Sequence, residues 1–260
     1  MRIRLTGFML LIVFCVQAQD HYQLAPPLIS YSSAFFKDSM PVHIRFNQPG
    51  AEVRYTLTGE EPDKNAPLYK KPIIIRQAGT LKVKSMSKGF GPSETISIGF
   101  EKMGLPVKDI SYSRPNEYYA SLPKNILSDG VGGNSNFRSG NWLGYDSDTV
   151  SITVELEKPA LVSHVLLNLL QDENSWIFLP EQILAYYQDT ATGKFLPFAK
   201  ETFQHEGPAT RACSLRQLEA RSPAVTTKLL LEIQVLKKMP DWHASKGSHA
   251  WLFIDEIIIR

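Results

Sequence analysis

Two polar segments of this 260-residue chain place aromatic side chains beside hydrogen-bonding groups. The first segment contains Asp172, Asn174 and Trp176, and the second contains the adjacent pair Trp242 and His243. An indole ring can stack on the apolar C–H face of a sugar ring while polar neighbours bind the sugar hydroxyls. These residue types therefore predict a shallow carbohydrate site in one or both segments.

Each segment also has a structural alternative. Trp176 follows a polar stretch of the kind that places binding residues on loops, but its ring would equally pack inward on Phe178. The second segment would equally close one end of a β-barrel. We expect Trp142 and Trp251 to be core residues, because both adjoin apolar, strand-like runs.

No residue pattern points to a catalytic centre. The motifs Gly-x-Ser-x-Gly and His-Glu-x-x-His do not occur in the sequence. The chain has two cysteines, and Cys15 lies in an N-terminal segment that we expect to be removed. Cys213 then has no partner for a disulfide and no second thiolate for a zinc site. We therefore predict that the protein is not an enzyme.

Residues 1–18 are predicted to be a signal peptide. Arg2 and Arg4 form a basic start, residues 5–16 are mostly apolar, and Val16-Gln17-Ala18 offers the small-x-small pattern read by signal peptidase. Cleavage after Ala18 would export the protein to the periplasm, the cell surface or the medium. A lipid anchor on Cys15 is the alternative. No later stretch is long and apolar enough to cross a membrane.

The charge balance excludes two classes of partner. The full chain has 28 lysines and arginines against 26 aspartates and glutamates, so loss of the two N-terminal arginines brings the net charge to zero. A neutral chain has no electrostatic footprint for nucleic acid or for an anionic membrane surface.

The first part of the chain alternates apolar and polar residues in short runs. The runs that fit strands are Val42–Phe46, Val53–Leu57, Ile73–Ile75, Leu81–Lys84 and Ile96–Phe100. Turn-forming glycines and prolines separate these runs. A period of two with frequent turns is typical of antiparallel sheets, so we predict a small β-sandwich over residues 26–101.

A second and larger set of β segments follows a joint at residues 104–106. Strands are expected at 150–156, 161–170, 182–187, 228–235 and 251–259. Residues 201–223 are polar and contain two prolines, and we interpret them as a long loop with at most one helical turn. The predicted fold class is thus all-β, with a second sandwich over residues 108–260.

The first region resembles a known domain family. Residues 50–62 read GAEVRYTLTGEEP, and Leu68-Tyr69 and Lys71-Pro72-Ile73 follow. This pattern is similar to the small fibronectin-III-like domain near the C-terminus of chitobiases and β-hexosaminidases. The family usually has aspartate at the position of Thr58, where threonine supports a tight turn more weakly.

The second region resembles the factor 5/8 type C jelly roll, also called discoidin-like or galactose-binding-like. The matching residues are LSDG at 127–130, WLGY at 142–145, VEL at 154–156, SWIFLP at 175–180, GKF at 193–195 and AWLFIDEI at 250–257. Such domains end some family 20 glycoside hydrolases, and relatives are classed as family 32 carbohydrate-binding modules. The resemblance therefore implies sugar binding.

The same resemblance implies a structural calcium ion. Asp129 and Glu256 occupy the places of the family's two carboxylate ligands, with carbonyl oxygens supplied by the loop around Gly132, Asn134 and Asn136. Calcium takes six to eight oxygen ligands, so this set would be chemically adequate. The alternative is that Asp129 caps a turn and Glu256 pairs with a lysine or arginine.

Three hypotheses follow. The leading one is an exported, non-catalytic protein that binds glycans containing galactose or N-acetylglucosamine, with the first domain as a rigid spacer. The second is a structural accessory that docks on another exported protein. The third is a fragment related to a β-N-acetylhexosaminidase, which would lack the (β/α)₈ barrel of ~250 residues that carries catalysis in family 20.

Overall fold

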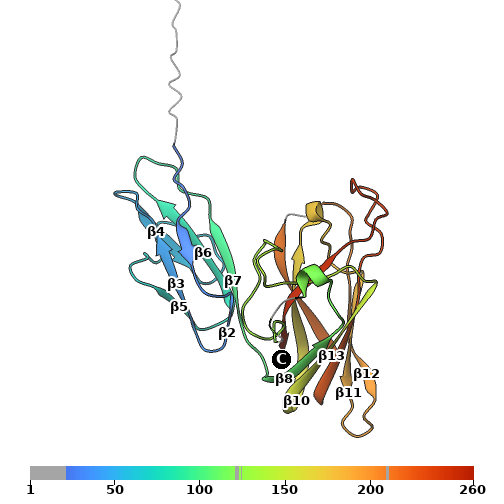
Figure 1. Ribbon diagram of the computed structural model, residues 1–260. Coiled ribbons are helices and arrows are strands. Elements are labelled where there is room, and N and C mark those ends of the chain that lie inside the picture. Colours follow the sequence, from blue (N-terminus) through green and yellow to red (C-terminus); the bar gives the residue numbers. More distant parts are fainter. Residues whose placement is uncertain (1–21, 121–122, 124, 209–210) are drawn as a thin grey trace, which may run out of the picture.

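The computed structural model describes residues 22–120, 123, 125–208 and 211–260. The predicted signal peptide at 1–18 lies outside these ranges, so its cleavage stays a prediction. Two β-sandwiches lie side by side (Figure 1), and helix within the described ranges is limited to the 3-10 turns η1 (Glu117–Tyr119) and η2 (Glu173–Ser175). No helix in this part of the chain is long and apolar enough to span a bilayer. The all-β fold class is confirmed.

The first sandwich consists of two small sheets. Its strands are β1 (Leu28–Ser30), β2 (Phe35–Phe36), β3 (Met40–Arg45), β4 (Glu52–Thr56), β5 (Ile73–Ile75), β6 (Gly79–Met86) and β7 (Ile96–Lys102). One sheet has the order β1-β3-β5 and the other β2-β7-β6-β4. All these neighbours are antiparallel except β2 and β7.

The alternation in the sequence explains how the first sandwich closes. Along β3, Met40, Val42 and Ile44 are buried while the residues between them are exposed. On β6, Leu81 and Val83 are buried and their neighbours are partly exposed. These side chains meet in one apolar core, because alternate residues of a strand point to the same face of its sheet.

The second sandwich is larger and contains two very long strands. Its strands are β8 (Val107–Tyr112), β9 (Leu143–Tyr145), β10 (Thr149–Gln171), β11 (Gln182–Gln188), β12 (Phe195–Thr202), β13 (Ala212–Gln234) and β14 (Leu252–Ile259). The order is β12-β11-β13-β10-β14-β9, and β8 pairs with the first half of β10. The long strands β10 and β13 pair with each other along their length and bend where the register of this pairing shifts. The same two strands therefore contribute to both layers of the sandwich.

The interpretation of residues 201–223 as a loop was wrong, because most of this segment belongs to a strand. Residues from Ala212 onward pair with β10, for example Leu215 with Asn168. Pro223 falls at the register break of this ladder, where its missing N–H removes no ladder hydrogen bond. The strand has one largely solvated face, which explains its polar sequence.

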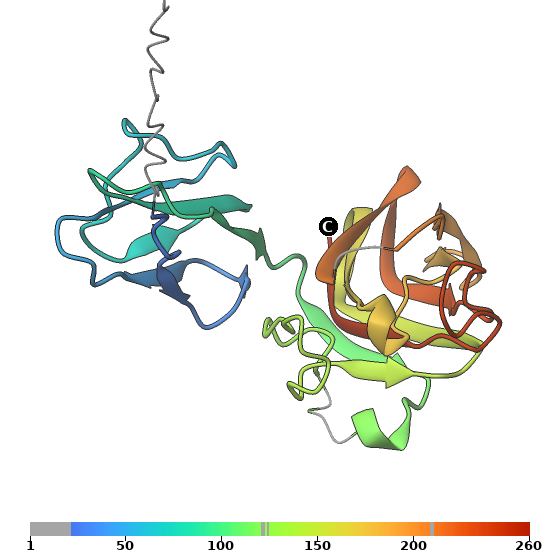
Figure 2. The same cartoon turned by 90° about the horizontal axis from the view of Figure 1, so that it is seen from above.

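The two sandwiches are packed against each other around Phe35. Its ring lies in an apolar cluster with Leu166 and Ile258 of the second sandwich, and Met103 packs on the same cluster. Figure 2 shows how the chain passes from β7 through residues 103–106 into β8. The strands of the first sandwich thus lie within residues 28–102, and those of the second lie within residues 107–259. The domain limits 26–101 and 108–260 remain a prediction from the sequence.

Polar contacts reinforce this interface. The backbone N–H of Gly132 donates to Ser33 Oγ at 3.3 Å, and Arg260 forms an ion pair with Glu101. The N–H of Leu105 donates to the carbonyl oxygen of Ile259 at 2.8 Å. The linker is therefore hydrogen-bonded to the second sandwich rather than free in solvent.

Candidate functional site

The turn that carries Trp176 is held in an unusual conformation. Trp176 follows η2 and has φ +67°, and it is the one non-glycine residue with positive φ in the described part of the chain. Its N–H donates to the carbonyl of Glu173 at 2.9 Å, and its own carbonyl accepts from the N–H of Trp251 at 2.8 Å. The side chain is 42% exposed. The backbone is thus fixed on both sides while the ring faces solvent.

Asp172 supports this turn from below. Its side chain is 2% exposed, and its carboxylate accepts from Ser175 Oγ at 2.8 Å and forms an ion pair with Arg211. The backbone of Asp172 also makes two hydrogen bonds with Ile177, which closes the turn. Asn174, in contrast, is exposed. Of the first predicted segment, Asn174 and Trp176 therefore face solvent, and the carboxylate of Asp172 is engaged within the protein.

The second predicted segment lies against the first. His243 Nδ1 accepts from the N–H of Ser245 at 3.0 Å, so the ring proton is assigned to Nε2, which donates to the carbonyl of Glu173 at 3.0 Å. Trp242 Nε1 donates to the carbonyl of His205 at 2.8 Å. The structure brings both segments together, but it uses the polar atoms of Trp242 and His243 internally.

Further aromatic side chains adjoin this end of the sandwich. The Tyr119 ring lies 5.7 Å from Trp251 and 4.8 Å from Phe253, and Phe137 lies 5.7 Å from Phe253, all measured between ring centroids. Tyr119, Phe137 and Trp251 are partly exposed. In Figure 1, η2 and the red loop before β14 occupy the same end of the second sandwich. The sequence offered no signal for Tyr119 or Phe137, because they come from different segments.

The predicted core tryptophans differ in position. Trp142 is buried, and its Nε1 donates to the carbonyl of Asn134 at 2.9 Å. Trp251 is only partly buried, and it lies immediately before β14. Phe178 is buried and packs on Trp242, with ring centroids 6.0 Å apart. Trp176 therefore did not take the inward position on Phe178 that was its alternative.

A group of carboxylates lies at a bulge in β14. Leu167 pairs with Ile257 and Leu169 with Ile254, so Asp255 and Glu256 together face one residue, Asn168. A bulge redirects side chains, and both acids are fully buried here. The calcium prediction named Asp129 and Glu256 and omitted Asp255. The sequence signal for Asp255 was its position beside Glu256 within an otherwise apolar strand.

Both acids are bound by the loop that follows Asp129. The N–H of Gly130 donates to Glu256 Oε1 at 2.6 Å, and the N–H of Gly133 donates to Asp255 Oδ2. The side chain of Asp129 lies beside Glu256 and accepts from the N–H of Val131 at 2.7 Å. Asp129 thus does cap its turn, whereas Glu256 pairs with this loop rather than with a lysine or arginine.

The electrostatics of this group favour either a proton or a cation. Burial raises the pKa of Asp255 to about 7 and that of Glu256 to about 9. Asp255 Oδ1 and Glu256 Oε2 are buried, and no described residue forms a hydrogen bond with either oxygen. These orphaned oxygens fit a calcium ion, although the described residues contain no cluster of three or more His, Cys, Asp or Glu side chains placed to hold a metal. Calcium would therefore draw most of its ligands from loop carbonyls.

Solved structures similar to this chain include several carbohydrate-binding modules. The module CpGH89CBM32-6 of Clostridium perfringens is 15% identical, with 59% of this chain and 94% of that chain covered and a TM-score of 0.36. The family 32 module of AlyQ, solved with 4,5-unsaturated mannuronic acid, is 14% identical over 61% and 98%, with a TM-score of 0.39. Chitosan-binding module 1 of the Paenibacillus sp. IK-5 chitosanase/glucanase is 12% identical over 60% and 96%, also at 0.39.

Matches at the sequence level are confined to the first sandwich. No curated protein matches the chain. The family model described as the chitobiase/beta-hexosaminidase C-terminal domain matches residues 32–97, and this confirms the resemblance inferred from residues 50–73.

Proposed function

We propose that this protein is an exported, non-catalytic carbohydrate-binding protein whose sugar site is the Trp176 end of the second sandwich. The observation that carries the proposal is the left-handed backbone of Trp176 combined with its exposed ring. Positive φ at a bulky residue costs on the order of 1–3 kcal/mol, and such strain gathers at binding sites. An exposed ring recovers little of that cost by burial, so a bound ligand is the natural explanation.

The hydrogen bonds around Trp176 support a stacking role. The turn is tied to β14 through Trp251 and to the loop before β14 through His243. A ring held in advance loses little conformational freedom when a sugar stacks on it. The exposed amide of Asn174 can hydrogen-bond sugar hydroxyls beside it. We expect weak affinity for a single site, because a shallow surface buries little of a polar ligand.

The ligand and the architecture follow from the sequence resemblance. We propose galactose- or N-acetylglucosamine-containing glycans as ligands and the first sandwich as a rigid spacer. The contact of Phe35 with Leu166 and Ile258 supports the rigidity of that spacer. The absence of catalysis is part of the proposal, and the match of residues 32–97 to the chitobiase/beta-hexosaminidase C-terminal domain supports it.

We also propose that a structural calcium ion is held by Asp129 and Glu256, with Asp255 in contact. The unpartnered oxygens of Asp255 and Glu256 support this assignment. The ion would neutralise the buried carboxylates and hold the loop that follows Asp129 against β14. Its role would be to stabilise the fold, with no part in chemistry on the sugar.

Titration with lactose and N,N′-diacetylchitobiose tests the sugar site. Wild-type protein should bind at least one of these ligands in the millimolar range, and Trp176→Ala should abolish binding. Phe90→Ala is the matched control, because Phe90 is an exposed aromatic residue of the first sandwich. Folded protein that binds neither these ligands nor any glycan of a broad array would contradict the proposal.

One observation favours docking on another exported protein as a second candidate. Leu161 and Val225 face each other across β10 and β13, and they are 62% and 55% exposed. Contiguous exposed apolar side chains mark contact surfaces when they form a large enough patch, and this pair would be the centre of such a patch. Co-purification of the protein with an exported hydrolase, lost in Leu161→Lys and combined with no glycan binding, would favour this candidate over sugar binding.

A further inference from the structure

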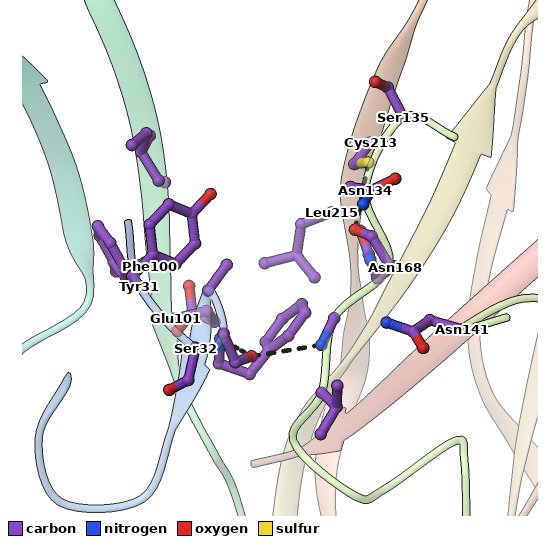
Figure 3. Close-up of a pocket in the computed structure, with 18 of the residues that line it drawn as sticks. Tyr31, Ser32, Phe100, Glu101, Asn134, Ser135, Asn141, Asn168, Cys213 and Leu215 are labelled. Atoms are coloured by element: carbon purple, nitrogen blue, oxygen red, sulfur yellow. Dashed lines mark hydrogen bonds between the residues drawn. The ribbon is translucent and has the colours of Figure 1, made fainter. Parts of the chain in front are cut away.

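A cleft of about 680 Å³ separates the two sandwiches above the Phe35 contact. Figure 3 shows Tyr31 and Phe100 on one side, and Asn134, Asn141 and Cys213 on the other. The volume lies within the range of roughly 300–1,000 Å³ that is usual for small-molecule sites, and sites between domains are common. No part of the Trp176 turn lines this cleft.

The wall from the first sandwich offers an aromatic surface with hydroxyl groups. Tyr31 is partly exposed, and its ring meets Phe100 edge-on with centroids 5.2 Å apart. Ser97 and Thr80 extend this wall along β7 and β6. An aromatic ring beside hydroxyl groups provides both a stacking face and hydrogen-bond partners for a sugar.

The wall from the second sandwich offers amides and one apolar side chain. Asn134 and Asn141 come from the loop before β9, and Leu215 lies on the outer face of β13. Asn168, on β10, also lines this wall, and its side chain lies close to Asp255. Amides both donate and accept hydrogen bonds, so they suit a ligand rich in hydroxyl or acetamido groups.

The cleft carries almost no free charge. Among the described residues that line it there is no lysine, arginine or histidine, and their one acid, Glu101, is paired with Arg260. Such a lining disfavours nucleotides, phosphates and uronic acids, because a charged ligand would lose its hydration without a counter-ion. The lining instead matches an uncharged polar molecule that has an apolar face.

The cleft is also held open by the contacts at its base. The Phe35 ring fills the space above Leu166 and Ile258, and the Gly132 N–H donates to Ser33 Oγ. Glycine at 132 allows this close approach, since a Cβ there would lie 2.5 Å from the ring of Phe35 and would force it to shift. A site formed before the ligand arrives avoids the cost of ordering two domains.

We propose that the cleft between the sandwiches is a second binding site, specific for a neutral oligosaccharide segment that stacks on Tyr31. The site shares its ligand class with the Trp176 surface but contains none of its residues, so either site can fail without the other. A chain long enough to reach both would bind more tightly than either site alone, provided that the geometry allows both contacts.

Cys213 provides a local probe for this site. The residue is exposed and lines the cleft, while desolvation of its sulfur raises the pKa of the thiol to about 11. A methanethiosulfonate reagent at constant pH, with mass spectrometry of the Cys213 peptide, measures its rate of modification. Lactose, N,N′-diacetylchitobiose and cellotetraose serve as neutral ligands, and digalacturonate serves as the charged comparison.

At least one neutral ligand should slow the modification of Cys213 saturably, by about tenfold at ten times its Kd. Protection should persist in Trp176→Ala and disappear in Tyr31→Ala. Ser97→Trp, which fills the cleft from an exposed position on β7, should remove protection even if Tyr31→Ala fails to fold. The proposal is overturned if no neutral ligand protects the thiol, if digalacturonate protects as well, or if Trp176→Ala alone removes the effect.

Discussion

His243 Nε2 donates to the carbonyl oxygen of Glu173 at 3.0 Å, and this bond ties the loop before β14 to the turn that carries Trp176. The bond joins residues 70 positions apart, so it exists only in the folded protein. In the proposed sugar site this bond would give His243 a positioning role, in which the imidazole orders the turn without touching the ligand.

Replacement of His243 by alanine should therefore weaken glycan binding. Loss of one internal hydrogen bond costs about 1 kcal/mol, or roughly fivefold in Kd. Titration measures the change, and hydrogen exchange of the Trp176 amide should accelerate in parallel. Asp241→Ala is the control, since Asp241 is an exposed residue of the same loop. Unchanged exchange at Trp176 would contradict the positioning role.

Trp176→Gly should separate stability from binding. Glycine adopts positive φ without a steric penalty, so relief of strain should offset the loss of side-chain contacts. We expect a Tm equal to or above that of the wild type, together with the loss of glycan binding. Thermal unfolding and titration on the same sample measure both. A large drop in Tm would show that the ring contributes to packing instead.

Calcium should raise the Tm of the wild-type protein, and EGTA should lower it. Glu256→Gln should remove this response, because it replaces the carboxylate that would bind the ion and whose Oε2 has no hydrogen-bond partner among the described residues. Glu157→Gln, at an exposed position on β10, should respond as the wild type does. Differential scanning calorimetry at fixed pH measures the shift. If calcium has no effect, the buried acids are held by protons alone.

Gly132→Ala should disturb the contact between the sandwiches. The added Cβ would lie 2.5 Å from Phe35 Cε2, so the ring must move away from Leu166 and Ile258. We expect a larger radius of gyration by small-angle scattering and faster proteolysis of residues 103–106. Gly207→Ala is the control, because no atom of the described residues lies within 4 Å of a Cβ at that position. Identical scattering curves would show that the Phe35 contact does not hold the two units.

Acid should weaken the first sandwich through Glu61. Hydrogen bonds from Lys82 and Thr95, at 2.8 and 2.6 Å, lower the pKa of Glu61 to about 2. A folded-state pKa below the ordinary value contributes stability above about pH 4.5 that is lost as the pH falls toward 2. Glu61→Gln should therefore lower Tm slightly at pH 6 and hardly at all at pH 2. The effect is small because the carboxylate is exposed to solvent. Equal Tm differences at both pH values would refute it.

The sequence by itself determined the fold class and most of the strands. Alternation along Met40–Arg45 and the apolar run of Leu252–Ile259 reflect burial of one or both faces, which is a local property of each segment. The predicted relation of residues 50–73 to an accessory domain also held, because turn and core residues of that motif lie close together in the chain. The two candidate binding loops could also be predicted, because the residues of each loop lie close together in the sequence.

Only the tertiary structure decided what those residues do. The polar residues after Ala212 became a strand because β10 supplied hydrogen-bond partners, and Asp255 joined Glu256 because a bulge turned both acids toward the loop after Asp129. The left-handed turn at Trp176 depends on bonds to β14 and to His243. Each of these outcomes is a contact between residues that are distant in the sequence. A local sequence pattern does not predict such a contact, because the partner is brought near only by folding.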